Sequence, residues 1–221
     1  MDLDEFKLHN LGMEKNKFGR IYSFVDFGNV NYWYERDERD GGDDVLREGE
    51  KLVVGVEKLC DFAKLFSAHS RFYFGMDTEN KKSIYIIKKA RSCFDRTITK
   101  PIQRIKHYLT KKDCFGNTRA VNQDHDGQFV YIPKCNFDVE IAVDVFRLID
   151  EFDTLCLFSG DADFAYLLEF LKRKNKQIIL FSAGYVSHDL RERASLNVNA
   201  QKIKKYITFV KQKPRLFGAR F

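Results

Sequence analysis

The chain has 221 residues, of which 44% are hydrophobic and 32% charged, a composition typical of one ordinary globular domain. It is too long for a disulfide-stapled mini-protein and too apolar for a disordered tail, and its three prolines leave no room for a flexible linker. No apolar run approaches the roughly 18 residues of a membrane-spanning helix, and the N-terminus lacks a signal peptide's apolar stretch. We therefore expect a protein without membrane contact that stays in the cytoplasm.

The net charge of +6 is unevenly distributed along the chain. Residues 81–112 carry 11 Lys or Arg against one acid, residues 165–221 carry 13 against three, and residues 35–50 carry eight acids against three bases. The two basic segments favour a polyanionic partner such as nucleic acid, although a solvated helix face explains such a run as well. Candidate phosphate contacts in these segments are Lys88, Lys89, Arg91, Lys202, Lys204 and Lys205.

The first half of the chain alternates between strand and helix patterns. A β-branched and aromatic run predicts a strand over 21–25 that ends at Asp26, and the acidic segment 35–50 is expected to be an exposed loop. Apolar spacing predicts a helix over 52–66, and a strand follows over 71–74. A second helix is predicted over 81–94, with its buried side formed by Ile84, Ile87 and Ala90.

The second half continues the same alternation after an ambiguous region. Residues 97–132 fit strand or irregular structure, with a hairpin tip at 124–127. Asn136 is placed to cap a helix that runs to about residue 152. A strand over 154–158, a helix over 163–174 and a strand over 177–181 complete the pattern. The whole predicts a doubly wound α/β domain with a mainly parallel sheet at 21–210, an N-terminal extension at 1–20 and a basic tail at 211–221.

Acidic residues follow the predicted strands at the points where ligands bind in such a sheet. Asp26 comes directly after the first strand, and Asp161 and Asp163 follow the strand that ends at Phe158. Asp138 lies in the first turn of a helix, on the face that points to the core. Because ligands bind outside the carboxyl ends of parallel strands, we expect these four acids to converge.

Convergent carboxylates repel one another, so either their pKa values rise or cations neutralise them. A site built only from oxygen ligands favours Mg²⁺ or Mn²⁺. Two such ions about 3.5–4 Å apart activate a water and stabilise the leaving oxygen in phosphodiester hydrolysis. The acids therefore predict a metal-dependent phosphodiesterase, and the basic segments suit a nucleic-acid substrate.

Simpler roles exist for several of these residues. Asp138 can be a helix N-terminal charge and Asp163 a helix cap, whereas Asp26 has no such role in prospect. Asp144, further along the helix, is either close to the site or solvated. The side chains of Asn29 and Ser159 can orient a ligand or a neighbouring carboxylate, or only close their turns.

Three segments together resemble the NYN domain, in its LabA-like branch within the PIN-like nucleases. They are Val25-Asp-Phe-Gly-Asn-Val-Asn31, Asp138-Val-Glu-Ile-Ala-Val-Asp144 and Ser159-Gly-Asp-Ala-Asp-Phe164, and the likeness extends over about 21–210. The resemblance implies that Asp26, Asp138, Asp161 and Asp163 hold Mg²⁺ or Mn²⁺, that Asn29 is their polar partner and that Asp144 is a second helix acid. Ala162 replaces the usual Ser, and Lys134 stands four residues before Asp138 where a base is expected three before it. We count Lys134 as a further candidate phosphate contact.

What the resemblance implies about function is a metal-dependent ribonuclease with RNA as its substrate. A non-catalytic RNA-binding or scaffold module that retains the acidic pocket is the alternative, and cleavage against binding in a chelator discriminates the two. The sequence leaves the oligomeric state open, a homodimer included.

Overall fold

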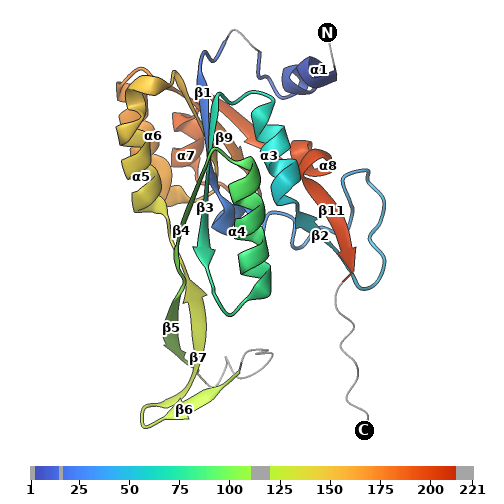
Figure 1. Cartoon of the computed structure of the whole chain (residues 1–221), viewed down its shortest axis with the longest axis vertical. Helices are drawn as coiled ribbons and strands as arrows, with labels where there is room; N and C mark the ends of the chain where they lie inside the picture. Colours follow the sequence, from blue (N-terminus) through green and yellow to red (C-terminus); the bar gives the residue numbers. More distant parts are fainter. Residues whose placement is uncertain (1–2, 15–16, 111–119, 213–221) are drawn as a thin grey trace.

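A six-stranded parallel sheet forms the centre of the protein (Figure 1). The computed structural model describes residues 3–14, 17–110 and 120–212. The strands lie in the order β10-β9-β8-β1-β3-β4, and every neighbouring pair is parallel. Their bounds are β1 (Ile21–Asp26), β3 (His69–Met76), β4 (Arg96–Pro101), β8 (Thr154–Phe158), β9 (Gln177–Ser182) and β10 (Leu196–Asn199). The strands predicted over 21–25, 71–74, 154–158 and 177–181 and their parallel arrangement are confirmed, whereas β10 was not predicted and β4 overlaps the start of the region that the sequence left ambiguous.

Helices cover both faces of this sheet, as predicted for a doubly wound domain. Successive strand residues point to opposite faces, so Val25 and Phe24 enter two different cores. One face packs against α3 (Val56–Lys64), α4 (Lys81–Cys93) and α8 (Lys204–Ile207), and the other against α5 (Asp138–Arg147), α6 (Ala165–Arg173) and α7 (His188–Arg193). Both cores are rich in aromatic side chains, which accounts for much of the chain's Phe content.

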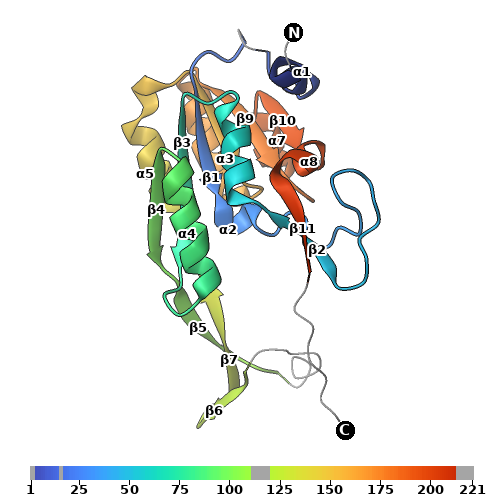
Figure 2. The same ribbon diagram turned by 45° about the vertical axis from the view of Figure 1, so that its right-hand side comes forward.

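Two smaller antiparallel sheets lie outside the central one. The strands β2 (Glu50–Val54) and β11 (Thr208–Gln212) pair beside α3 and α8. The strands β5 (Gln103–Tyr108), β6 (Asn122–Asp124) and β7 (Gly127–Lys134) form an arm, in the order β5-β7-β6, between β4 and α5. Figures 1 and 2 show this arm extending away from the central sheet. The remaining elements are α1 (Leu3–Asn10), α2 (Phe27–Val30) and the 3₁₀ turns η1 (Ile149–Glu151), η2 (Ala162–Phe164) and η3 (Ala200–Ile203).

Two helix predictions need correction in the first half. The helix expected over 52–66 begins only at Val56, because Leu52–Val54 pair with Thr208–Val210 near the other end of the chain. In α4, Ile84 is 49% exposed, and Ser83 and Ile86 are the buried neighbours of Ile87 instead. The helix itself is confirmed, with its buried stripe turned slightly from the expected position.

The helix after Asn136 also differs in its ends. Its N-cap residue is Phe137, and the Asn136 amide oxygen accepts a hydrogen bond from the Asp138 backbone N at 2.8 Å. The helix ends at Arg147, and a separate 3₁₀ turn covers 149–151. The hairpin tip predicted at 124–127 is confirmed between β6 and β7, with Gly127 at a φ of +129°.

The two terminal segments relate differently to the core. Leu8 and Leu11, from the predicted N-terminal extension, are buried against the α3 side of the sheet. Of the expected basic tail, residues 211–212 belong to β11 and residues 213–221 lie outside the described residues. Among the described residues, no helix combines the length and the apolar character needed to span a membrane.

Candidate metal centre

The acidic residues gather where the strand order of the central sheet reverses. After β1 the chain adds β3 and β4 on one side of it, and β8 later joins the other side. Asp26 is the last residue of β1, and Asp161 follows the end of the neighbouring strand β8. Asp138 begins α5, which covers the same face of the sheet as α6 and α7. Such a reversal leaves an open crevice at the carboxyl ends of the strands, where α/β proteins bind their ligands.

Three of the four predicted acids bring carboxylate oxygens within reach of one cation. Asp138, Asp161 and Asp163 each offer an oxygen, and these atoms lie within 4.8 Å of one another. Asp161 caps the turn η2 by accepting a hydrogen bond from the Asp163 backbone N at 3.1 Å. This local turn presents both carboxyl groups on the same short segment. The capping role considered for Asp163 therefore belongs to Asp161.

Asp26 lies beside these three residues and is linked to them through Ser159. Its Oδ2 accepts a hydrogen bond from Ser159 Oγ at 3.1 Å, and Ser159 Oγ accepts one from the Asp161 backbone N at 3.3 Å. The Asn29 backbone N donates to Asp26 Oδ1 at 3.4 Å. Burial is the main reason why the pKa of Asp26 is raised to about 6, and the charges of Asp138 and Asp161 raise it as well. The hydrogen bonds from Ser159 and Asn29 act in the opposite direction and lower it.

The Asn29 side chain connects the two loops that carry the acids. Its Oδ1 accepts a hydrogen bond from the Gly160 backbone N at 3.2 Å and another from Trp33 Nε1 at 2.8 Å. The loop after β8 is thereby held against the α2 turn that follows β1. The Asn29 side chain thus orients the backbone of the loop after β8, a role that differs from the two that the sequence suggested for it.

Asn136, which the sequence suggested only as a helix cap, also touches the site. Its Nδ2 donates to Asp138 Oδ2 at 2.6 Å. Burial raises the pKa of Asp138, the Asn136 hydrogen bond lowers it, and the neighbouring charges of Asp161 and Asp163 raise it again. An Asn two residues before an acid that opens a helix is the signal that identifies such a partner in the sequence.

No basic side chain of the described residues forms an ion pair with these four acids. The closest compensation comes from Lys100, whose charge lowers the pKa of Asp138 while its Nζ bonds Glu140 Oε1 at 2.6 Å. A dense group of carboxylates without counter-charge, and with oxygen as its only donor, suits a hard divalent cation such as Mg²⁺ or Mn²⁺. The residues present fit that group of metals.

Asp144 lies elsewhere and is neither solvated nor part of the cluster. Its Oδ2 accepts hydrogen bonds from Arg71 Nη1 and Tyr73 Oη, both at 2.8 Å, and only 16% of its side chain is exposed. These contacts join α5 to β3. We therefore assign Asp144 to the attachment of the helix that carries Asp138.

Some of the predicted phosphate contacts are exposed, whereas others are already held by an acidic side chain or a carbonyl oxygen of this chain. Lys88 and Arg91 are exposed on α4, whereas Lys89 Nζ pairs with Glu57 at 2.7 Å. Lys204 Nζ bonds Asp37 and the Arg39 carbonyl oxygen, both at 3.1 Å, so this lysine anchors the acidic loop. The others, Lys134 at the end of β7 and Lys202 and Lys205 near α8, are exposed.

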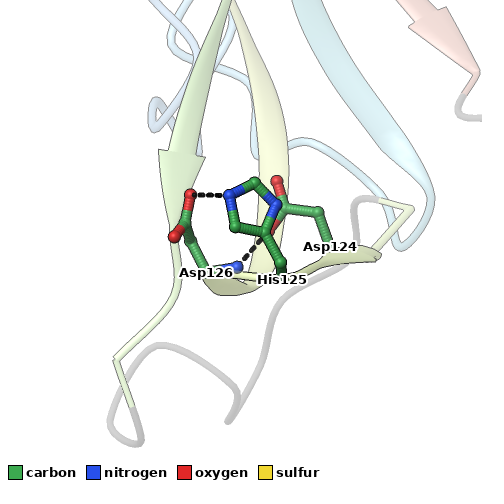
Figure 3. Close-up of side chains that lie close together, drawn as sticks. All are labelled: Asp124, His125 and Asp126. Atoms are coloured by element: carbon green, nitrogen blue, oxygen red, sulfur yellow. Dashed lines mark hydrogen bonds and ion pairs between the residues drawn. The ribbon is translucent and has the colours of Figure 1, made fainter.

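A second acidic group occupies the tip of the arm (Figure 3). Asp124, His125 and Asp126 offer atoms within 4.8 Å of one another. Lys106 Nζ forms an ion pair with Asp124, and Tyr108 Oη donates to Asp124 at 3.1 Å. The Lys106 hydrogen bond lowers the pKa of Asp124, so this group already has a counter-charge from its own chain.

Comparison with known proteins places the chain in a family. A model of the NYN domain matches residues 20–199. The chain belongs to the NYN domain family. The doubly wound sheet and its acidic edge agree with the PIN-like fold of this family. The predicted family is confirmed.

Two relatives illustrate this membership. A segment of 78 residues is 32% identical to the "Low amplitude and bright protein LabA" of Synechococcus elongatus, covering 35% of this chain and 42% of that protein. The chain thus matches less than half the length of this curated relative. A protein of unknown function from Vibrio parahaemolyticus has a crystal structure that matches 89% of this chain and 100% of its own, with a TM-score of 0.58 and 19% identity. At that identity the likeness shows the fold alone.

Proposed function

We propose that this NYN domain is a metal-dependent ribonuclease that hydrolyses RNA phosphodiester bonds at the edge of its central sheet. The observation that carries the proposal is the convergence of Asp138, Asp161 and Asp163 within 4.8 Å, beside Asp26. Family membership supports the same reaction class, because NYN domains are related to PIN-like nucleases. Mg²⁺ and Mn²⁺ are the cations whose ligand preference fits these oxygens.

Each acid has a distinct part in the proposed site. Asp138, Asp161 and Asp163 would hold the cation, and Asp26 would complete the set from its partly buried position at the end of β1. When bound, the metal lowers the pKa of a water and stabilises the oxygen that leaves phosphorus. Ser159, Asn29 and Asn136 keep the carboxylates in place by donating hydrogen bonds to Asp26 and Asp138.

The proposal is tested by incubating the purified protein with labelled single-stranded RNA, duplex RNA and single-stranded DNA in Mg²⁺, in Mn²⁺ and in EDTA. We expect cleavage of RNA with a divalent cation and none in EDTA. The variant Asp161→Asn should lose cleavage, whereas Asp126→Asn, which removes one charge from the arm-tip group instead, should retain it.

Two other outcomes are decisive against the proposal. RNA binding in EDTA without cleavage under any metal condition would favour the non-catalytic module. Cleavage that survives Asp161→Asn would mean that the activity comes from a contaminant or from another part of the chain.

A further inference from the structure

A cavity of about 300 Å³ opens next to the carboxylate cluster, on the α4 side of the sheet. Four parts of the chain form its walls: the turn after β1, the end of β3, the start of α4 and the base of the arm. Its volume is at the lower end of the range typical of small-ligand sites. None of the residues that form the metal cluster lines it.

The turn that carries Gly28 separates the cavity from Asp26. Gly28 lines the cavity, and a Cβ added there would lie 3.2 Å from Asp26 Oδ1. Cys135 lines the cavity at the base of the arm; burial raises the pKa of its thiol, and the nearby charge of Asp26 adds to that effect. Gly28 thus places one wall of the cavity next to Asp26.

The lining combines apolar surface with hydrogen-bonding groups. Phe74, Ile86 and Ile102 provide apolar contacts, and Asn31 adds an amide. Tyr32 also lines the cavity and is 61% exposed, although large aromatic side chains usually bury most of their surface. A partly exposed aromatic ring that lines a half-apolar cavity offers a face on which a nucleic-acid base can stack.

Positive charge lies beside the same cavity. Lys82 lines it from the first turn of α4. Asp77 also lines it, and Arg104 Nη2 lies 3.7 Å from Asp77 Oδ1. Partial burial lowers the pKa of Lys82, the charges of Lys51 and Lys211 lower it further, and the charge of Glu35 raises it. Lys51 and Lys211 come from paired positions of β2 and β11. Three lysines from separate elements attract phosphate groups more effectively than any one of them alone.

We propose that this cavity binds the unpaired base of the nucleotide next to the bond that is cut, with Tyr32 stacking on the base and Lys82 contacting a phosphate. The inference rests on the proposed ribonuclease function and names the substrate class. A base inside a duplex is already stacked and paired, so a base can enter the cavity only from a single strand, a loop or a bulge. Ile102, Pro133 and Cys135 lie where the arm joins the central sheet, so this end of the arm is part of the proposed substrate site.

The decisive comparison uses Tyr32→Ala and a matched control. Tyr85 on α4 is 58% exposed and does not line the cavity, so Tyr85→Ala removes a similar ring from a different place. Each variant is assayed on a short single-stranded RNA and on bis(p-nitrophenyl) phosphate, a diester without base or sugar. We expect Tyr32→Ala to lower kcat/KM on RNA by about 10-fold more than on the small diester, because one stacked base contributes roughly this much.

A binding measurement separates this inference from the ribonuclease proposal. The dissociation constant of a fluorescent single-stranded RNA, measured in EDTA, should rise about 10-fold for Tyr32→Ala and remain unchanged for Tyr85→Ala. Equal constants for Tyr32→Ala and wild type would overturn the base site, even if RNA is cleaved. Failure of the wild type to cleave RNA or the small diester would overturn the ribonuclease function alone, and the binding result would still decide the base site.

An abasic scan locates the site along the substrate. RNA strands that lack a single base at successive positions are cleaved by the wild type, and only the position next to the cut should reduce the rate. The same scan with Tyr32→Ala should show no such position. A wild-type scan without position dependence would contradict the proposal.

Discussion

Two groups of acids in this protein have similar composition and opposite electrostatic surroundings. At the arm tip, Lys106 pairs with Asp124, and the tyrosine of the same strand donates to the acids. At the sheet edge, Asp138, Asp161 and Asp163 have no such ion pair in the described chain, and the pKa of Asp138 is raised. The two groups therefore differ less in their number of acids than in whether the chain itself supplies a counter-charge.

The difference follows from the elements that carry each group. The arm tip is a tight turn, and Lys106 lies on β5 within the same small sheet, where one flexible side chain reaches across. The sheet edge brings together a strand end, a loop and a helix start, and backbone N–H groups and Asn or Ser side chains orient its acids. These donors orient the acids without cancelling their net charge.

The largest expected effect concerns Asp26. Asp26→Asn should reduce RNA cleavage by at least about 100-fold, because it removes the carboxylate that completes the proposed metal site. Asp124→Asn, the corresponding change at the arm tip, should leave the rate within about twofold. Initial rates at saturating Mn²⁺ measure both, and similar losses in the two variants would remove the distinction between the groups.

The next effect is stabilisation by metal. At a Mn²⁺ concentration 100 times its dissociation constant, binding adds about 2.7 kcal/mol, which raises Tm by roughly 5–10 °C for a domain of this size. Asp138→Asn should lose most of this shift, whereas Asp124→Asn should keep it. Thermal unfolding with and without Mn²⁺ provides the measurement, and an undiminished shift in Asp138→Asn would place the metal elsewhere.

The pH dependence of stability should differ between the two groups. The folded-state pKa of Asp26 is raised from 3.8 to about 6, so without metal the protein loses stability as pH rises through this window. Asp26→Asn should lack this loss and be more stable than wild type at pH 7, by at most about 3 kcal/mol. Urea unfolding in EDTA between pH 4 and 7 measures the difference.

The pKa of Asp124 is shifted in the opposite direction from that of Asp26, so its effect on the pH dependence of stability differs. Its pKa is lowered, so its contribution to stability is present above the ordinary range of a carboxyl group and is lost only as pH falls through the lowered pKa. Between pH 4 and 7 the difference between wild type and Asp124→Asn should therefore stay nearly constant. A parallel trend for both variants would contradict the assignment of counter-charges.

The smallest expected effect concerns basic side chains, which also differ in whether the chain itself supplies their counter-charge. Lys88 and Arg91 are exposed on α4, while Lys204 is held by Asp37 and the Arg39 carbonyl oxygen. Removing both α4 residues should flatten the salt dependence of RNA binding by about 0.7 for each phosphate that the variant no longer neutralises. Lys204→Ala should lower Tm and leave the slope unchanged. Affinities at several salt concentrations test this, and an unchanged slope for the α4 double variant would make its charge merely solubilising.

Much of the fold was predictable because its signals are local. Continuous apolar strands and amphipathic helices alternate along the chain, and an acid or a glycine turn marks the ends of β1, β3, β8 and β9. The strand at Leu52–Val54 was missed because its partner, Thr208–Val210, is distant in sequence and its apolar residues continue the period of the helix that follows. Local spacing cannot reveal a pairing of that kind.

In the candidate site, too, the features that depend on local sequence were predictable and those that depend on distant contacts were not. The acids could be located because each follows a strand or opens a helix, whereas their hydrogen-bond partners depend on contacts between distant segments. The ion pair of Asp144 with Arg71 and the lysine group around Lys82 also arise from separate elements. Basic runs in the sequence therefore indicated a charged surface without identifying which lysines remain free.

The single tryptophan of the chain gives the site a built-in optical reporter. Trp33 donates to the same Asn29 oxygen that accepts from Gly160, and its ring stacks against Phe158 at the end of β8. Any rearrangement of the loop after β8 changes the hydrogen bonding and polarity around this indole. The emission of this native fluorophore can therefore report, without a label and without a substrate, whether an added divalent cation changes the loop after β8.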